Sequence, residues 1–195
     1  DTYPELAYFD CYACHHPMNQ PQWTPHPELA SRTGMPQLND AHLLMLYHAA
    51  QRSDAALARQ LQAQRLALHA AILQDAHATQ QAALALRATA SRLREQFRQH
   101  TFRPGDMVAV ARQLVQDSAG HRINDYLTAE QATLALSSLI AGLQASHSIT
   151  DSQHQALQHA LDKVYTTVKT PETFDASRFH AAMSPLLPLI REPSP

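Results

Sequence analysis

The longest stretch without a helix breaker constrains the fold more than any other feature of the sequence. No Gly or Pro occurs between Pro36 and Pro104. Within this stretch, apolar residues recur three, four or seven positions apart, which is the spacing of one face of an α-helix. These residues are Leu57, Leu61, Leu68, Ile72, Ala76, Ala83, Leu86, Ala90, Leu93 and Phe97. A single helix from Asn39 to the last of them would be about 90 Å long. We therefore expect a break near Ser53-Asp54 or at Asp75, where an aspartate can cap a new helix.

The remainder of the chain also favours helices. Only four of the 195 residues in the whole chain are Gly, and Ala, Leu and Gln are abundant. This composition favours helices. We expect Asn39 or Asp40 to cap the first helix. Further helices are expected over residues 106–118, 128–146, 151–168 and 175–183. Thr128 and Gln131 resemble a capping box at the start of the second of these.

No segment shows the alternating pattern of a strand. The predicted fold class is therefore all-α, with an irregular N-terminal segment followed by a helical bundle that contains one or more long helices. The Pro-rich C-terminal tail, which begins near Pro185, is expected to lie on the surface.

Charge and cysteine content exclude several classes of protein. The formal net charge is -2, and the 15 basic residues are scattered, so no nucleic-acid-binding surface is indicated. No apolar run is long enough for a transmembrane helix. The only two cysteines are three positions apart, so they cannot form a disulfide framework for the fold.

Both cysteines lie in a Pro-rich N-terminal segment, in the sequence Cys11-Tyr12-Ala13-Cys14-His15. Cys-x-x-Cys-His is the attachment signature of c-type haem. On one helical turn, Cys11 and Cys14 share a face and can form thioethers with one porphyrin edge. His15 can then bind the iron. A zinc or copper site and a redox dithiol are the alternatives, but a dithiol of the thioredoxin type needs neighbouring strands.

Through Cys11, Cys14 and His15 the chain resembles the c-type cytochromes. The resemblance implies one covalent haem c with His15 as an iron ligand. It also implies attachment outside the cytoplasm, and therefore a periplasmic or otherwise exported protein. The segment "TGMPQL", residues 33–38, resembles the distal-ligand loop of class I cytochromes c, which implies that Met35 is the sixth ligand.

Other residues compete with Met35 for the sixth position. His42, Met45 and His48 recur along the first expected helix, which can cover the distal side of a haem. An open, five-coordinate iron is a further alternative. The run "CHHP" also occurs in multihaem class III cytochromes c, where the second histidine can bind a neighbouring haem. By this resemblance, His16 is a candidate ligand for a haem in another subunit or partner.

These features predict a haem c attachment region over residues 1–50 and a helical bundle for docking or assembly over residues 51–195. The expected function is electron transfer to and from redox partner proteins, with a homo-oligomer or larger redox complex as a further expectation. A haem-based gas sensor and a structural subunit of a multihaem assembly are the alternatives. The later histidines are scattered along the sequence, so no enzyme is expected. They are His121, His147, His154, His159 and His180.

Overall fold

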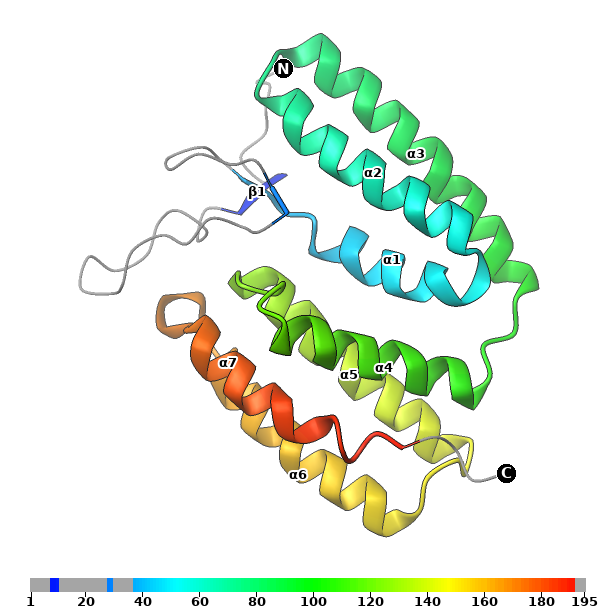
Figure 1. Ribbon diagram of the computed structural model, residues 1–195, viewed down its shortest axis with the longest axis vertical. Coiled ribbons are helices and arrows are strands. Elements are labelled where there is room, and N and C mark those ends of the chain that lie inside the picture. The colour runs from blue at the N-terminus through cyan, green and yellow to red at the C-terminus, as the bar shows by residue number, and fades with distance from the viewer. Residues whose placement is uncertain (1–7, 11–27, 30–36, 192–195) are drawn as a thin grey trace. The chain divides into compact units, whose positions relative to one another are not determined.

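The computed structural model describes residues 8–10, 28–29 and 37–191 (Figure 1). The predicted all-α class is confirmed, because the described residues form seven α-helices and one pair of two-residue strands. The chain divides into two compact units, residues 1–101 and 102–195. The expected functional division after residue 50 lies inside the first helix, so it does not coincide with the boundary between these units.

The first unit contains three helices: α1 (Ala41–Ser53), α2 (Ala55–Ile72) and α3 (Ala76–Gln99). In Figure 1, α2 and α3 run side by side, and α2 also packs against α1. Their shared core includes four of the apolar residues that recur at helical spacing, together with two buried alanines. These residues are Leu57, Leu61, Leu86 and Leu93, with Ala50 and Ala58.

Both of the expected helix breaks are present. The Oδ1 atom of Asp54 accepts hydrogen bonds from the amides of Ala56 and Leu57, each at 2.9 Å. At the next turn, Oδ1 of Asp75 accepts from the amide of Ala78 at 2.7 Å. Each aspartate satisfies amides at the start of a helix that have no intrahelical partner. The stretch without Gly or Pro therefore folds as three helices that pack on one another.

The second unit is a closed four-helix bundle. Its helices are α4 (Pro104–Ala119), α5 (Tyr126–Ala145), α6 (Asp151–Thr167) and α7 (Ala176–Met183). Short 3₁₀ turns, η3 (Pro171–Thr173) and η4 (Ser184–Leu186), precede and follow α7. Each helix packs against the next, and α7 returns to contact α4. Fully buried alanines on α4 and α5 lie among leucines in the core, and only 6% of the residues of the chain are aromatic.

The start of α5 differs from the prediction. The helix begins at Tyr126, and the cap is Asp125, whose Oδ1 accepts from the amide of Thr128 at 2.7 Å. Thr128 is buried in the first turn, so it does not form the expected capping box with Gln131. The box occurs at α6 instead, where Thr150 Oγ1 accepts from the amide of Gln153 at 3.2 Å.

The C-terminal tail also differs from the prediction over its described part. Leu186 and Ile190 are buried in the second unit, although a surface position was expected. Arg112 on α4 donates from Nη1 to the carbonyl oxygen of Ile190 at 2.7 Å. Pro185 and Pro188 prevent a regular α-helix here, but Leu186 and Ile190 still bury their side chains in the bundle.

Candidate functional site

The predicted haem-binding residues lie outside the described part of the chain. This holds for Cys11, Cys14, His15, His16 and Met35. The structure describes instead the residues that flank this segment, 8–10 and 37–39, together with residues 28–29 within it. These described residues define the candidate site, and the ligand assignments stay predictions.

The two ends of this segment are joined by an antiparallel pair of strands, β1 (Phe9–Asp10) and β2 (Gln37–Leu38). Phe9 pairs with Leu38, and Asp10 pairs with Gln37. The amide of Asn39 also donates to the carbonyl oxygen of Tyr8 at 2.9 Å, which extends the pairing by one step. Residues 11–36 therefore connect the two strands of one antiparallel pair. We call them the motif loop.

Glu28 holds the motif loop at a second point. Its Oε2 atom lies 2.6 Å from Nη2 of Arg65 on α2. The same oxygen accepts a hydrogen bond from Nε2 of Gln62 at 3.0 Å. A charge-assisted bond of this length is about twice as strong as a neutral one. The loop is therefore attached both to its own base and to the middle helix of the first unit.

Arg65 is the centre of this polar cluster. Its side chain is only 2% exposed, yet its guanidinium contacts two carboxylates. Nη1 lies 2.6 Å from Oδ2 of Asp40, and Nε donates to Oε1 of Gln62 at 3.0 Å. Burial of an unpaired guanidinium would be very unfavourable, so the two carboxylates stabilise Arg65 in its buried position.

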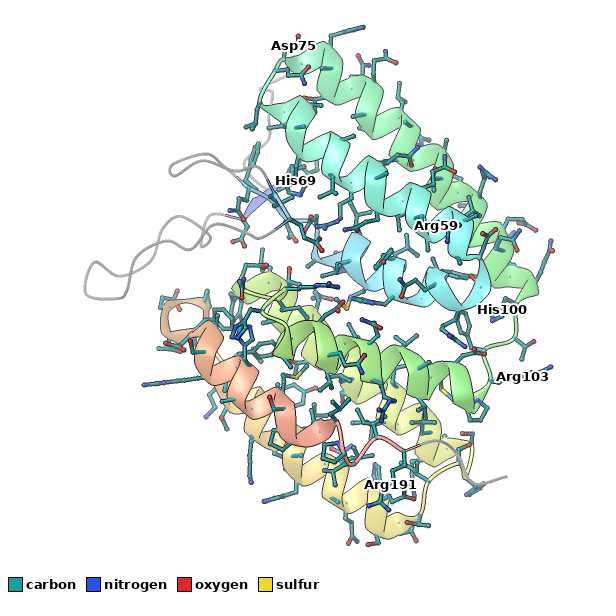
Figure 2. All side chains as sticks on the ribbon, in the orientation of Figure 1. Arg59, His69, Asp75, His100, Arg103 and Arg191 are labelled. Atoms are coloured by element: carbon teal, nitrogen blue, oxygen red, sulfur yellow. The ribbon has the colours of Figure 1, made fainter. Side chains whose placement is uncertain are left out.

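The arrangement follows from helical spacing. Gln62, Arg65 and His69 occupy positions i, i+3 and i+7 of α2, and residues at this spacing share one face. Figure 2 labels His69 on this helix; its Nε2 lies 2.7 Å from Oδ2 of Asp40. We name Glu28, Asp40, Gln62, Arg65 and His69 the Arg65 cluster.

Asp40 has a different role from the one predicted. It occupies the N-cap position of α1, but its side chain makes no capping bond. Its carboxylate is used by Arg65 and His69 instead. Burial alone would raise the pKa of Asp40, but the hydrogen bond to His69 and the charge of Arg65 outweigh burial and hold that pKa below its usual value. Asp40 is therefore ionised at neutral pH and supplies the negative charge that Arg65 needs.

The alternative sixth ligands all lie on α1, which begins three residues after β2. His42 is exposed and Met45 is half-buried. His48 is only 1% exposed, and its ring centroid lies 5.4 Å from that of Tyr47. These three residues are near the base of the motif loop in the chain, so they stay alternatives to Met35 in the prediction.

One close pair of histidines was not predicted from the sequence. His121 and His180 are far apart in the chain, and their separation gave no reason to connect them. In the second unit their ring centroids lie 4.4 Å apart, with an interplanar angle of 83°. His121 follows the end of α4, and His180 lies on α7. Only the packing of α7 against α4 brings them together.

Among residues 8–10, 28–29 and 37–191, no group of three or more His, Cys, Asp or Glu side chains could hold a metal ion. No helix in the same residues is long and apolar enough to cross a membrane. No protein-family model, curated protein or solved structure matches this chain.

Proposed function

We propose that this protein is an electron-transfer c-type cytochrome with one haem covalently bound through Cys11 and Cys14. His15 is the proposed proximal ligand, and Met35 is the proposed sixth ligand. The observation that carries the proposal is a Cys-x-x-Cys-His motif in a loop that is closed by β1–β2 and attached by Glu28 to Arg65. When bound, haem supplies a one-electron redox centre whose potential depends on its ligands and its burial.

The donor set and the described frame are compatible with this cofactor. Two thiols and an imidazole at this spacing suit two thioethers and one axial ligand. Cys11 directly follows Asp10, and Met35 precedes Gln37 by two residues, where Asp10 and Gln37 are paired. Since consecutive Cα atoms are 3.8 Å apart, connectivity limits the Cα separation of Cys11 and Met35 to about 17 Å. The proposed attachment and distal ends therefore belong to one closed loop.

In this proposal, the described residues position the motif loop, and none of them binds the haem iron. The β1–β2 pair fixes the two ends of the motif loop, and the Arg65 cluster fixes Glu28. The helices then serve as a docking or assembly module for redox partners. An electron-transfer protein benefits from such a rigid frame, because little rearrangement is then needed between its oxidised and reduced states.

Absorption spectra of the oxidised and reduced protein, produced together with a c-type haem maturation system, test the proposal. We expect haem that acidified organic solvent does not extract. The double variant Cys11→Ala/Cys14→Ala should lose this covalent attachment. A colourless wild-type protein, or one whose haem is freely extracted, would refute the proposal.

A second experiment tests the ligands and the reaction type. His15→Ala should abolish the low-spin spectrum, whereas the neighbouring His16→Ala serves as a matched control and should leave it unchanged. Met35→Ala should remove any Met–iron charge-transfer band. If the wild-type iron is five-coordinate and binds carbon monoxide readily, a gas-binding function replaces electron transfer.

A further inference from the structure

His180 has an unusual hydrogen-bonding state for a buried side chain. The residue is only 6% exposed, and its Nε2 lies 2.7 Å from the carbonyl oxygen of Ile123. A carbonyl oxygen can only accept, so Nε2 carries the proton and Nδ1 carries a lone pair. Nδ1 is buried and has no hydrogen-bond partner among the described residues. Buried polar atoms are rarely left in this way, so its lone pair needs an explanation.

The hydrogen bond to Ile123 is the kind that a metal-binding histidine makes. Such a histidine usually donates its second ring N–H to a backbone carbonyl or carboxylate, which fixes the ring orientation and the tautomer. With the Nε2 proton donated to Ile123, Nδ1 is the ring nitrogen of His180 that is left to bind a metal.

His121 supplies a second imidazole at this position. Its ring centroid is 4.4 Å from that of His180. Two imidazoles bound at about a right angle to one metal have centroids about 4.5 Å apart, because each metal–nitrogen bond is about 2.0 Å long. His121 is exposed, so its ring can turn about its side-chain bonds and give a metal ion access from solvent.

The backbone around His121 is also well defined. His121 follows Gly120 at the end of α4 and has a φ of 57°, in the left-handed region. Its amide donates to the carbonyl of Ser118 at 2.9 Å, and its own carbonyl accepts from Nδ2 of Asn124 at 2.7 Å. These bonds hold the residue at the end of α4, against α7.

We propose that His121 and His180 form a two-histidine site for a divalent transition metal, with Cu²⁺ as the preferred ion. Nδ1 of His180 and one ring nitrogen of His121 are the protein ligands. Water completes the coordination, since no third protein ligand stands beside them among the described residues. Imidazole suits divalent copper, nickel and zinc, and affinity in this series is highest for copper. The site lies within the second unit and does not depend on the proposed haem.

Titration of the full chain carrying Cys11→Ala/Cys14→Ala with Cu²⁺ in a glycine buffer, followed by calorimetry, tests the site, because this variant removes the thiols that reduce and bind copper and glycine suppresses weak binding to scattered histidines. We expect one ion bound per chain above this background. His121→Ala should weaken its binding at least about 10-fold, because loss of an outer-shell partner alone typically costs that much and His121 is a direct ligand in this proposal. This variant replaces an exposed side chain and should fold.

His147→Ala is the matched control. His147 also follows a helix in the second unit, has a φ of 54° and is exposed, but no described aromatic ring contacts it. Its replacement should leave Cu²⁺ affinity unchanged. Electron paramagnetic resonance of the Cu²⁺ complex should show nitrogen coupling that His121→Ala reduces. Equal binding by the Cys11→Ala/Cys14→Ala chain with and without His121→Ala, or no saturable binding by that chain, would overturn the proposal.

Discussion

Replacement of Arg65 by Met is the most direct test of the Arg65 cluster. Met keeps an unbranched side chain in the 2%-exposed position of Arg65 but removes both ion pairs, to Glu28 and to Asp40, each 2.6 Å long. Removing one member of a buried pair destabilises a protein by about 3–5 kcal/mol, because the other charge is left without compensation. The side chain of Asp40 is 12% exposed and keeps His69 as a partner, whereas that of Glu28 is 31% exposed and can be solvated. We therefore expect Arg65→Met to destabilise the first unit by about 3 kcal/mol, the lower end of this range.

Hydrogen exchange of peptides from α1, α2 and α3 measures this effect in the first unit alone, which matters because the chain has two compact units. A loss of about 3 kcal/mol should raise their exchange rates about 100-fold. Arg59→Met is the control. Arg59 is exposed on the same helix and is labelled in Figure 2, so its replacement should change stability by less than about 0.5 kcal/mol.

The variant should also respond to pH in a characteristic way. In Arg65→Met, buried Asp40 loses the charge of Arg65 but keeps His69, so its pKa should rise from the lowered value that it has in wild type. The stability that a lowered carboxyl pKa provides is present above the unfolded pKa and is lost as the pH falls below it, so the difference in stability between the variant and wild type should narrow below about pH 4. If Arg65→Met behaves like Arg59→Met at neutral pH, the cluster does not stabilise this unit and our reasoning is wrong.

Three further predictions concern caps, core and acid stability. Asp54→Ala should destabilise the first unit by about 1 kcal/mol, measured by exchange in α2, because it loses an N-cap; no change would show that water replaces the cap. Leu136→Ala, at a fully buried position of α5, should cost about 3 kcal/mol in urea unfolding, whereas Leu134→Ala, 45% exposed on the same helix, should cost less than about 0.5 kcal/mol. Since the pKa of Asp40 is held below its usual value, the stability of the wild-type protein should decrease as the pH falls below about 4. Asp40→Asn has no carboxylate to protonate, so the part of this decrease that comes from Asp40 should be absent.

Local sequence signals predicted the helices well where the competing interactions were also local. Asp54 and Asp75 interrupt an otherwise continuous helical pattern, and each caps the helix that follows. The same reasoning failed at Thr128, because Asp125 stands three residues earlier and provides the cap. At α1 it placed the N-cap correctly at Asp40, but it could not show that the carboxylate of Asp40 binds Arg65 and His69 instead of the helix amides.

The polar contacts that define the candidate sites could not be predicted in this way. Glu28 and Arg65 are 37 positions apart, and the bond from His180 to Ile123 spans 57 positions. Nothing in the local pattern connects such residues, because their contact depends on how helices and loops pack. The motif at Cys11, Cys14 and His15 is the opposite case, since its chemistry is contained in five consecutive residues.

Because Asp10 pairs with Gln37, the motif loop could be replaced by a connection of another length without separating the two strands. Antiparallel strands can be joined by a turn of two residues, so a short turn in place of residues 11–36 would connect the same two ends. Arg65 would lose Glu28, its more exposed partner, but would keep Asp40. The helices of the first unit are thus a scaffold on which loops of different length and chemistry can be exchanged while the core of α1, α2 and α3 is kept.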